Sequence, residues 1–211
     1  MTTSDPAEQA PFVDASVGVG VGVGVGIDVS RGTPSSTAQR PPRNVTSVGG
    51  LVFDAERQML LLVQMRYGPT QGRWMIPGGL VDPGETLDVA VVREVREETS
   101  VAAEPIGIVG IRSRRMGLDN DTYIIWLLRP ATGGDGAPAA GDTPQPQADG
   151  REIEIARWMP LTLVVDDPQV AYLVRYLAQQ LVAGALQPHT YVTDYEQLMP
   201  GVTDDDWKLF L

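Results

Sequence analysis

The stretch Gly78–Val101, GGLVDPGETLDVAVVREVREETSV, constrains the fold of this chain more than any other feature. Pro83 and Gly84 mark a turn, and Thr86 is a suitable N-cap for a helix that follows it. We expect the helix to run to about Thr99. Three aliphatic side chains at helical spacing should face the core: Leu87, Val91 and Val95.

The predicted helix carries three carboxylates close together, from Glu94, Glu97 and Glu98. At roughly 100° of rotation per residue, they fall within about a 100° arc. Hard oxygen ligands on a preformed helix suit Mg²⁺ or Mn²⁺, and Mg²⁺ usually acts on a substrate phosphate. The pattern therefore favours metal-dependent cleavage of a phosphoanhydride bond.

Charge and composition exclude several other classes of protein. The chain has 211 residues and a formal net charge of −11, so we expect one domain with tails and no binding to nucleic acid. It has no cysteine, which excludes disulfides, thiolate catalysis and cysteine zinc sites. The start lacks the basic and apolar regions of a secretory signal, and no apolar run is long enough to span a bilayer. We therefore expect a cytoplasmic protein without membrane contact.

Composition also predicts where the domain lies. Residues 1–43 form an expected low-complexity tail, and its Val-Gly repeat favours disorder, with a self-associating β-segment as the alternative. The domain should cover residues 44–187, interrupted by a low-complexity insertion at 131–150 that we expect to be disordered. Residues 188–211 form an acidic, aromatic tail, which either docks on its own domain or contacts another molecule, in a homodimer or with a partner.

Strand patterns occur on both sides of the central stretch. We expect strands at 45–54, 58–66, 73–77, 104–114, 121–130 and 151–160, with those at 104–114 and 121–130 paired across a turn. An amphipathic helix is predicted from Pro168 to about Ala183.

The spacing of the central stretch closely resembles the signature of the Nudix hydrolases. Five residues separate Gly79 from Glu85, and seven more precede Arg93. The remaining matching positions are Glu94, Val95, Glu97, Glu98 and Val101. Ser100 alone departs from the pattern, since the family has glycine there. The lead-in RWMIPGG and the strand order extend the resemblance, to the MutT and ADP-ribose pyrophosphatase type, over roughly Val45 to Ala183.

This resemblance implies an α/β/α sandwich, in which a mixed sheet is flanked by the signature helix and a C-terminal helix. By position, the Glu94, Glu97 and Glu98 carboxylates and the Gly78 carbonyl match the family's ligands for Mg²⁺ or Mn²⁺. Glu85 and Arg93 match the pair that braces the loop against the helix and orients the carboxylates. Glu98 is one candidate general base. The substitution at Ser100 removes no ligand, so we expect only a slightly shifted helix end.

The implied reaction is hydrolysis of a nucleoside diphosphate linked to another group, such as ADP-ribose, a nucleotide sugar or a modified nucleoside triphosphate. A nucleotide-binding or regulatory module without turnover is the alternative. Glu152 is a second candidate base, because an accessory glutamate in some family members lies six residues before a position matching Trp158. The alternative is an exposed carboxylate at a strand edge, at the end of a flexible loop. Arg66, Arg112 and Arg114 are candidate substrate contacts or plain surface charges. The particular substrate is left open.

Overall fold

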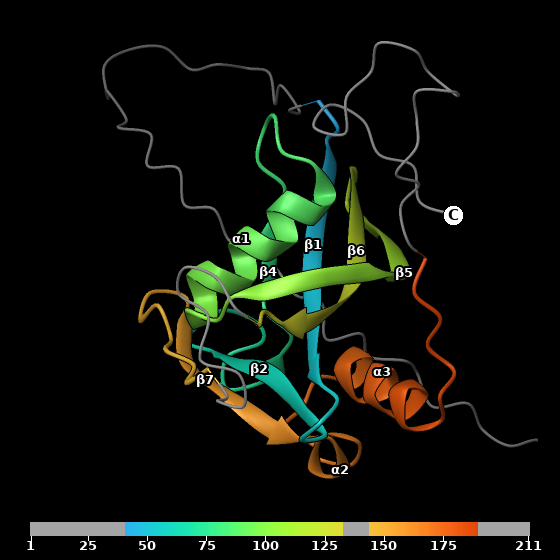
Figure 1. The fold of residues 1–211 in the computed structure, drawn as a ribbon. Helices are drawn as coiled ribbons and strands as arrows, with labels where there is room; N and C mark the ends of the chain where they lie inside the picture. The colour runs from blue at the N-terminus through green and yellow to red at the C-terminus, as the bar shows by residue number, and fades with distance from the viewer. Residues whose placement is uncertain (1–40, 133–143, 190–211) are drawn as a thin grey trace, which may run out of the picture.

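The computed structural model describes residues 41–132 and 144–189. The Val-Gly repeat, most of the predicted insertion and the C-terminal segment after residue 189 lie outside these ranges. Figure 1 shows the described residues as a sheet with helix α1 on one side and helices α2 and α3 on the other. This arrangement confirms the expected α/β/α sandwich.

A mixed seven-stranded sheet forms the centre of the fold. Its main path runs β3-β2-β1-β6-β5, while β4 pairs with β1 and β7 pairs with β2. Strands β1 and β6 are parallel, and the other pairs are antiparallel. The strands are β1 (Asn44–Asp54), β2 (Met59–Met65), β3 (Trp74–Met75), β4 (Gly78–Leu80), β5 (Ala103–Met116), β6 (Asp119–Pro130) and β7 (Ile153–Pro160).

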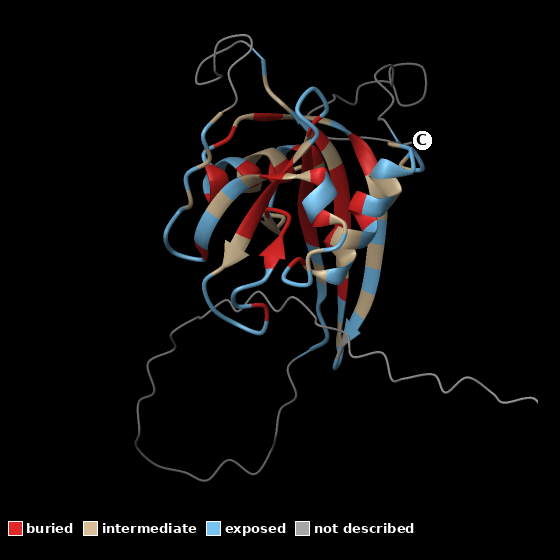
Figure 2. Cartoon of the chain, turned by 90° about the horizontal axis from the view of Figure 1, so that it is seen from below, coloured by how far each residue is buried: buried red, intermediate tan, exposed pale blue. Residues whose placement is uncertain are grey.

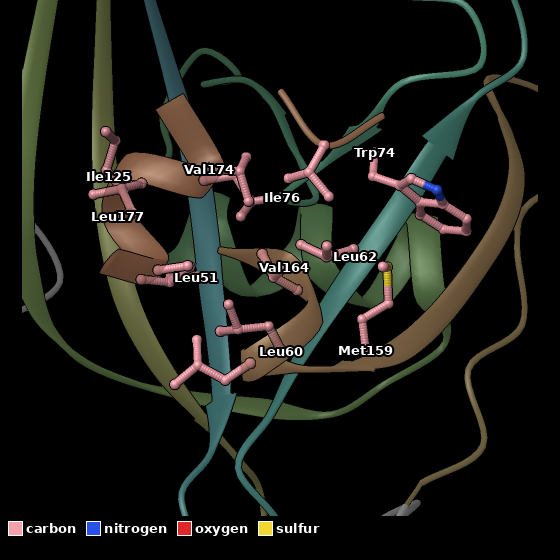
Figure 3. Packing of buried hydrophobic residues seen from close by; sticks show 13 residues of the cluster. Leu51, Leu60, Leu62, Trp74, Ile76, Ile125, Met159, Val164, Val174 and Leu177 are labelled. Atoms are coloured by element: carbon pink, nitrogen blue, oxygen red, sulfur yellow. The ribbon is translucent and has the colours of Figure 1, made fainter. Parts of the chain in front are cut away.

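Alternation along the central strands divides the core into two layers. Helix α1 (Leu87–Thr99) covers one layer, in which Val91 and Val95 pack against Trp126. Helices α2 (Leu161–Val164) and α3 (Tyr172–Val182) cover the other, which contains Leu51, Ile125 and Leu177 and is drawn in Figure 3. Buried residues follow the sheet between the two helical layers in Figure 2. Burial on both faces explains why these strands contain long apolar runs.

Most predicted elements are present, with some different bounds. The strands at 104–114 and 121–130 do form an antiparallel pair, as predicted. The last helix begins at Tyr172 and not at Pro168, because the backbone just before it pairs with β3: Val170 forms a parallel bridge to Trp74, and Ala171 N–H donates to the Trp74 carbonyl at 2.9 Å. Strand β4 and helix α2 were not predicted, since each is too short to show a period.

The described end of the predicted insertion, residues 144–150, contains no helix or strand but is bound to the domain. Trp158 Nε1 donates to the Pro144 carbonyl at 2.8 Å. Gln147 N–H donates at 2.8 Å to the carbonyl of Thr99, the last residue of α1. These contacts place the segment beside the end of the helix that carries the glutamates.

Helix α1 ends at Thr99, and the C-cap residue Ser100 has a φ of 58° in the left-handed region. An L-residue pays about 1 kcal/mol for this conformation, and glycine avoids most of that cost. We expect Ser100→Gly to raise the free energy of unfolding by about 0.5–1 kcal/mol, because glycine adopts this φ without strain. The gain is not larger, because glycine also makes the unfolded chain more flexible. Turnover should change by no more than about twofold, since no proposed ligand is lost. Thermal unfolding and kcat/KM measure both effects; a rate gain of orders of magnitude would contradict this account.

Candidate functional site

The site begins where β4 meets β1 and the end of helix α1. Strand β4 pairs antiparallel with β1, with Gly78 opposite Gly49. A Cβ atom at Gly78 would lie 2.2 Å from the Val48 carbonyl oxygen, so only glycine permits this close approach. Gly78 N–H in turn donates to Glu98 Oε2 at 2.9 Å. The glycine turn therefore fixes the Glu98 carboxylate against the edge of the sheet.

The second glycine of the turn leaves room for another carboxylate. A Cβ atom at Gly79 would lie 2.5 Å from Glu94 Oε1. Glu94 and Glu98 are four residues apart on α1, and both side chains reach the glycine turn. The chain thus brings two carboxylates against one short segment of backbone.

Arg93 connects the turn to the helix through a fork of hydrogen bonds. Its Nε donates to Glu85 Oε1 at 2.7 Å, and its Nη2 donates to Glu85 Oε2 at 2.8 Å and to the Leu80 carbonyl at 3.0 Å. Its Nη1 donates to Glu94 Oε1 at 2.8 Å and to Glu97 Oε2 at 3.2 Å. The predicted contact between Glu85 and Arg93 is present, and one guanidinium contacts three of the predicted site carboxylates.

The surroundings shift the pKa values of the site carboxylates in different directions. Burial raises the pKa of Glu98 well above the usual glutamate value; the Gly78 N–H opposes this, and the charges of Glu94, Asp149 and Glu152 add to it. Burial also raises the pKa of Glu94, against the pull of Arg93. The hydrogen bond from Arg93 lowers the pKa of Glu85. Glu85 is thus a stable anion that orients Arg93, whereas Glu98 is a buried carboxylate that forms no salt bridge within the described part of the chain.

The carboxylate set suits a hard divalent cation in its chemistry. In the described ranges, no three acidic or histidine side chains converge on one point as they stand. Glu97 has a side chain that is 61% exposed and points to Arg93, while Glu94 is bound by the same guanidinium. Glu94, Glu97 and Glu98 are the side chains here whose oxygens could hold such an ion. The Glu98 carboxylate is buried near other carboxylates, which costs free energy. A bound cation would offset that cost.

Glu152 lies near this cluster, on a turn that Asp149 fixes. Asp149 Oδ1 accepts hydrogen bonds from Arg151 N–H at 2.9 Å and from Ile153 N–H at 3.0 Å. Arg66 N–H donates to the Glu152 carbonyl at 2.9 Å, and the Arg66 side chain donates to the Gly150 carbonyl. The charges of Asp149 and Glu152 both act on Glu98. Arg66 therefore holds the turn that carries Glu152.

Asp149 was absent from the predicted site, although its signal was local. A side-chain oxygen that accepts backbone N–H groups two to four residues ahead is typical of an Asx turn, and Asp-Gly is a turn dipeptide. The sequence DGRE at 149–152 contains both features immediately before β7.

The structure brings Arg112 and Arg114 together at one end of the β5–β6 pair. Both guanidinium groups donate to Asp121 Oδ2, Arg112 Nη2 at 2.6 Å and Arg114 Nη2 at 2.7 Å. Their shared strand face agrees with the predicted two-residue period. Asp121 was not predicted as part of this group, because its position opposite Arg114 follows from the pairing of the two strands.

A mixed sheet between two helical layers, with a glutamate-bearing helix after a glycine turn, defines the Nudix type of α/β/α domain. The family model described as the NUDIX domain matches residues 43–180, and the chain belongs to this family. The family match rests on most of the described residues and includes the whole glycine turn and helix α1.

Individual relatives and solved structures agree with this assignment. Nudix hydrolase 8 of Arabidopsis thaliana is 29% identical over 174 residues, which cover 75% of this chain and 44% of that protein. The human 8-oxo-dGDP phosphatase NUDT18 is 34% identical over 106 residues, which cover 47% of this chain and 32% of that protein. The chain thus spans less than half the length of either relative. A MutT NUDIX hydrolase from Burkholderia pseudomallei has the same fold, with a TM-score of 0.51, 22% identity, and coverage of 65% of this chain and 98% of that one.

The Arg93 fork predicts a specific mutational result. We expect Arg93→Lys to lower kcat/KM by about 10- to 100-fold, because lysine cannot make the paired hydrogen bonds that orient Glu85 and Glu94. Steady-state kinetics with a nucleotide substrate measures the loss. Arg96→Lys is the matched control, since Arg96 is exposed on the same helix. Equal effects of the two substitutions would remove the fork from the site.

Proposed function

We propose that this protein hydrolyses the phosphoanhydride bond of a nucleoside diphosphate linked to another group, with a divalent metal ion. One observation carries the proposal: the glycine turn at Gly78 holds a buried Glu98 carboxylate beside Glu94, and Arg93 braces the turn and helix. A structural helix has no reason to bury a carboxylate among like charges. The cost is compensated when a cation binds there.

Glu94, Glu97 and Glu98, with the Gly78 carbonyl, would hold Mg²⁺ or Mn²⁺. When bound, such an ion offsets the negative charge of the diphosphate and lowers the pKa of the attacking water. Mg²⁺ is our first choice, because it is commonly bound by one or two carboxylates together with substrate phosphates.

The protein's own side chains supply orientation and proton transfer. Glu85 holds Arg93, which in turn sets the position of Glu94 and Glu97. Glu98 is one candidate to accept a proton from water, since its carboxylate is held at the glycine turn beside Glu94. Glu152, whose charge acts on Glu98, is the other candidate. Arg66 would hold the turn that carries Glu152 in place beside the substrate phosphates.

The names of the relatives support a nucleotide diphosphate as the substrate class. One relative is named an 8-oxo-dGDP phosphatase, and others are named nucleoside diphosphate-linked moiety X motif 6. An ADP-ribose complex of a Shewanella oneidensis domain has the same fold at 19% identity and a TM-score of 0.50. Within this class, the residues at the turn would bind the diphosphate unit common to every member.

A substrate panel tests this proposal. The full chain is incubated with ADP-ribose, a nucleotide sugar, 8-oxo-dGDP and a modified nucleoside triphosphate, with Mg²⁺ or with EDTA, and products are separated by chromatography. We expect cleavage at the phosphoanhydride of at least one compound and its loss in EDTA. Binding that persists in EDTA without turnover of any compound would indicate a nucleotide-binding module instead.

A cytoplasmic location and a homodimer belong to the same proposal. No helix within the described ranges is long and apolar enough to cross a membrane. Light scattering on the full chain and on a variant without Tyr191–Leu211 measures the oligomeric state. A dimer that survives removal of this segment would show that the C-terminal aromatic residues are not needed for association.

A further inference from the structure

The backbone around Glu152 is held by the side chain of Asp149. Its Oδ1 accepts hydrogen bonds from Arg151 N–H at 2.9 Å and from Ile153 N–H at 3.0 Å. Its Oδ2 accepts a longer one from Glu152 N–H, at 3.4 Å. Gly150, inside this turn, has a φ of 70°, which glycine adopts without strain. Three consecutive N–H groups therefore face one carboxylate, and we call residues 149–153 the Asp149 turn.

The loop after β2 holds the Asp149 turn from its other side. Arg66 N–H donates to the Glu152 carbonyl at 2.9 Å, and the Arg66 side chain donates to the Gly150 carbonyl. The next residue, Tyr67, interacts with the Glu152 side chain. Desolvation raises the pKa of the Tyr67 hydroxyl, and the charge of Glu152 and a hydrogen bond to its carboxylate raise this pKa further. Tyr67 is 48% exposed, so packing in the core does not explain its position.

A hydrogen bond also joins the segment before the Asp149 turn to the end of helix α1. Gln147 N–H donates to the Thr99 carbonyl at 2.8 Å. Gln147 lies two residues before Asp149, and Thr99 directly follows Glu98. The Asp149 turn is therefore tied to the end of the helix that carries Glu98. The effect of the Asp149 and Glu152 charges on the Glu98 carboxylate agrees with this placement.

A purely structural turn would not need a glutamate at position 152. Asp149 closes the turn through backbone N–H groups, so position 152 could carry many other side chains. Glu152 instead adds negative charge near Glu98, and like charges repel. Glu152 is exposed, so a water molecule can reach its carboxylate. It also lies on a different element from the proposed metal ligands, and it can accept a proton while those ligands hold the ion.

We infer that Asp149 and Tyr67 are positioning residues for the proposed hydrolysis: they hold the Glu152 carboxylate where it accepts a proton from the attacking water. In this step a water O–H bond breaks and the proton passes to Glu152. The water oxygen forms a bond to phosphorus, and the bridging P–O bond breaks with its electron pair on the leaving phosphate. Of the two candidate bases, the assignment favours Glu152. It rests on the proposed function, because the step requires hydrolysis of a phosphoanhydride.

Three single variants of the full chain test the positioning residues, with the best panel substrate and Mg²⁺. Asp149→Ala opens the turn, and we expect kcat to fall by about 10-fold or more while KM stays within about twofold. Asp149→Asn should keep kcat within about threefold, because an asparagine side chain makes the same turn without the charge. Tyr67→Phe removes only the hydroxyl and should lower kcat by about 3- to 10-fold.

Asp167→Ala is the matched control for Asp149→Ala. Asp167 Oδ1 accepts a hydrogen bond from Gln169 N–H at 2.8 Å, in a similar turn before helix α3. Helix α3 lies on the side of the sheet opposite α1 (Figure 1). This variant should therefore keep the wild-type kcat and KM.

A Glu152→Gln background separates positioning from a general effect on the fold. Glu152→Gln should itself lower kcat by at least about 100-fold, because an amide does not accept the proton. Since Asp149 and Tyr67 act through Glu152, adding Asp149→Ala or Tyr67→Phe to this background should lower kcat by less than about a further twofold. A merely structural role would give the same fold-loss in both backgrounds.

Hydrogen exchange of the Arg66 amide, measured by NMR, gives a readout that needs no turnover. This N–H donates to the Glu152 carbonyl, so its exchange reports whether the Asp149 turn is in place. We expect faster exchange in Asp149→Ala and wild-type exchange in Asp149→Asn.

Wild-type kcat in Glu152→Gln, additive losses in the double variants, or equal losses in Asp149→Asn and Asp149→Ala would overturn the assignment. The proposed hydrolysis fails by a different result, the absence of cleavage of any panel compound by the wild type. Proton transfer to Glu152 would then fail with it, and Arg66 exchange alone would decide whether Asp149 holds the turn. Unchanged exchange in Asp149→Ala would reject that role too.

Discussion

Glu98→Gln is expected to abolish most turnover while the fold is kept. The substitution removes a proposed metal ligand and one candidate base, so we expect kcat/KM to fall by at least about 100-fold. The Gly78 N–H can still donate to the amide oxygen, so the turn should retain its position. Kinetics with the best panel substrate measures the rate, and circular dichroism with thermal unfolding measures the fold.

The same substitution should leave the protein equally stable or more stable at neutral pH. The pKa of Glu98 is raised in the folded state, chiefly by burial, so folding favours its protonated form. That contribution to stability is present below the unfolded pKa and is lost as pH rises through the folded value. An amide stays neutral at every pH and therefore avoids this loss. A rise or no change in melting temperature together with lost activity is the signature of a functional buried carboxylate.

Glu154→Gln is the matched control for this experiment, since Glu154 is exposed on β7 near Glu152. It should leave both rate and stability unchanged. Near-wild-type turnover of Glu98→Gln would contradict the assignment of Glu98 to the site. A clear loss of stability would instead show that the carboxylate holds the turn through bonds that an amide cannot make.

Gly78→Ala is expected to have the second large effect, on stability and activity together. The new Cβ would lie 2.2 Å from the Val48 carbonyl oxygen and 2.8 Å from Gly49 Cα, and these backbone atoms cannot rotate away. Strand β4 must therefore separate from β1, at a cost of about 2–3 kcal/mol in the free energy of unfolding. The displaced turn would also move its N–H from Glu98, and turnover should fall by at least about 10-fold.

Gly110→Ala is a suitable control, because its new Cβ would meet only Ile125 Cδ1 at an ordinary 3.6 Å. Chemical denaturation and steady-state kinetics compare the two variants. If Gly78→Ala were as stable and as active as Gly110→Ala, the close pairing of β4 with β1 would not be what positions the site.

Local patterns predicted the elements that define this fold, and long-range pairing determined the rest. The spacing of aliphatic and acidic residues located helix α1 within its observed bounds, because both the core-facing stripe and the end at Thr99 are local features. The start of α3 was misplaced since Val170 is apolar and at helical spacing, yet its backbone bridges to Trp74, far away in the sequence. Strand β4 consists of two glycines and a leucine, whose only signal is the strand opposite it.

The site divides in the same way. Matching positions in the Nudix signature implied that Glu85 pairs with Arg93, a contact that is present, but the hydrogen bond from Gly78 N–H to Glu98 was not predicted. They could not predict that Arg93 also binds Glu94 and Glu97, since this depends on side-chain rotamers. Nor could they predict Asp121 between Arg112 and Arg114, because that contact requires the register of two strands.

Metal binding by the glutamate cluster is the central claim, and Mn²⁺ titration followed by electron paramagnetic resonance tests it most directly. The signal of free Mn²⁺ is measured as the full chain is added, for the wild type and for a Glu94→Gln, Glu98→Gln double variant. We predict saturable loss of the free-ion signal with the wild type, competed by Mg²⁺, and at least about 10-fold weaker binding by the folded double variant. Equal binding of Mn²⁺ by the two proteins would contradict the account.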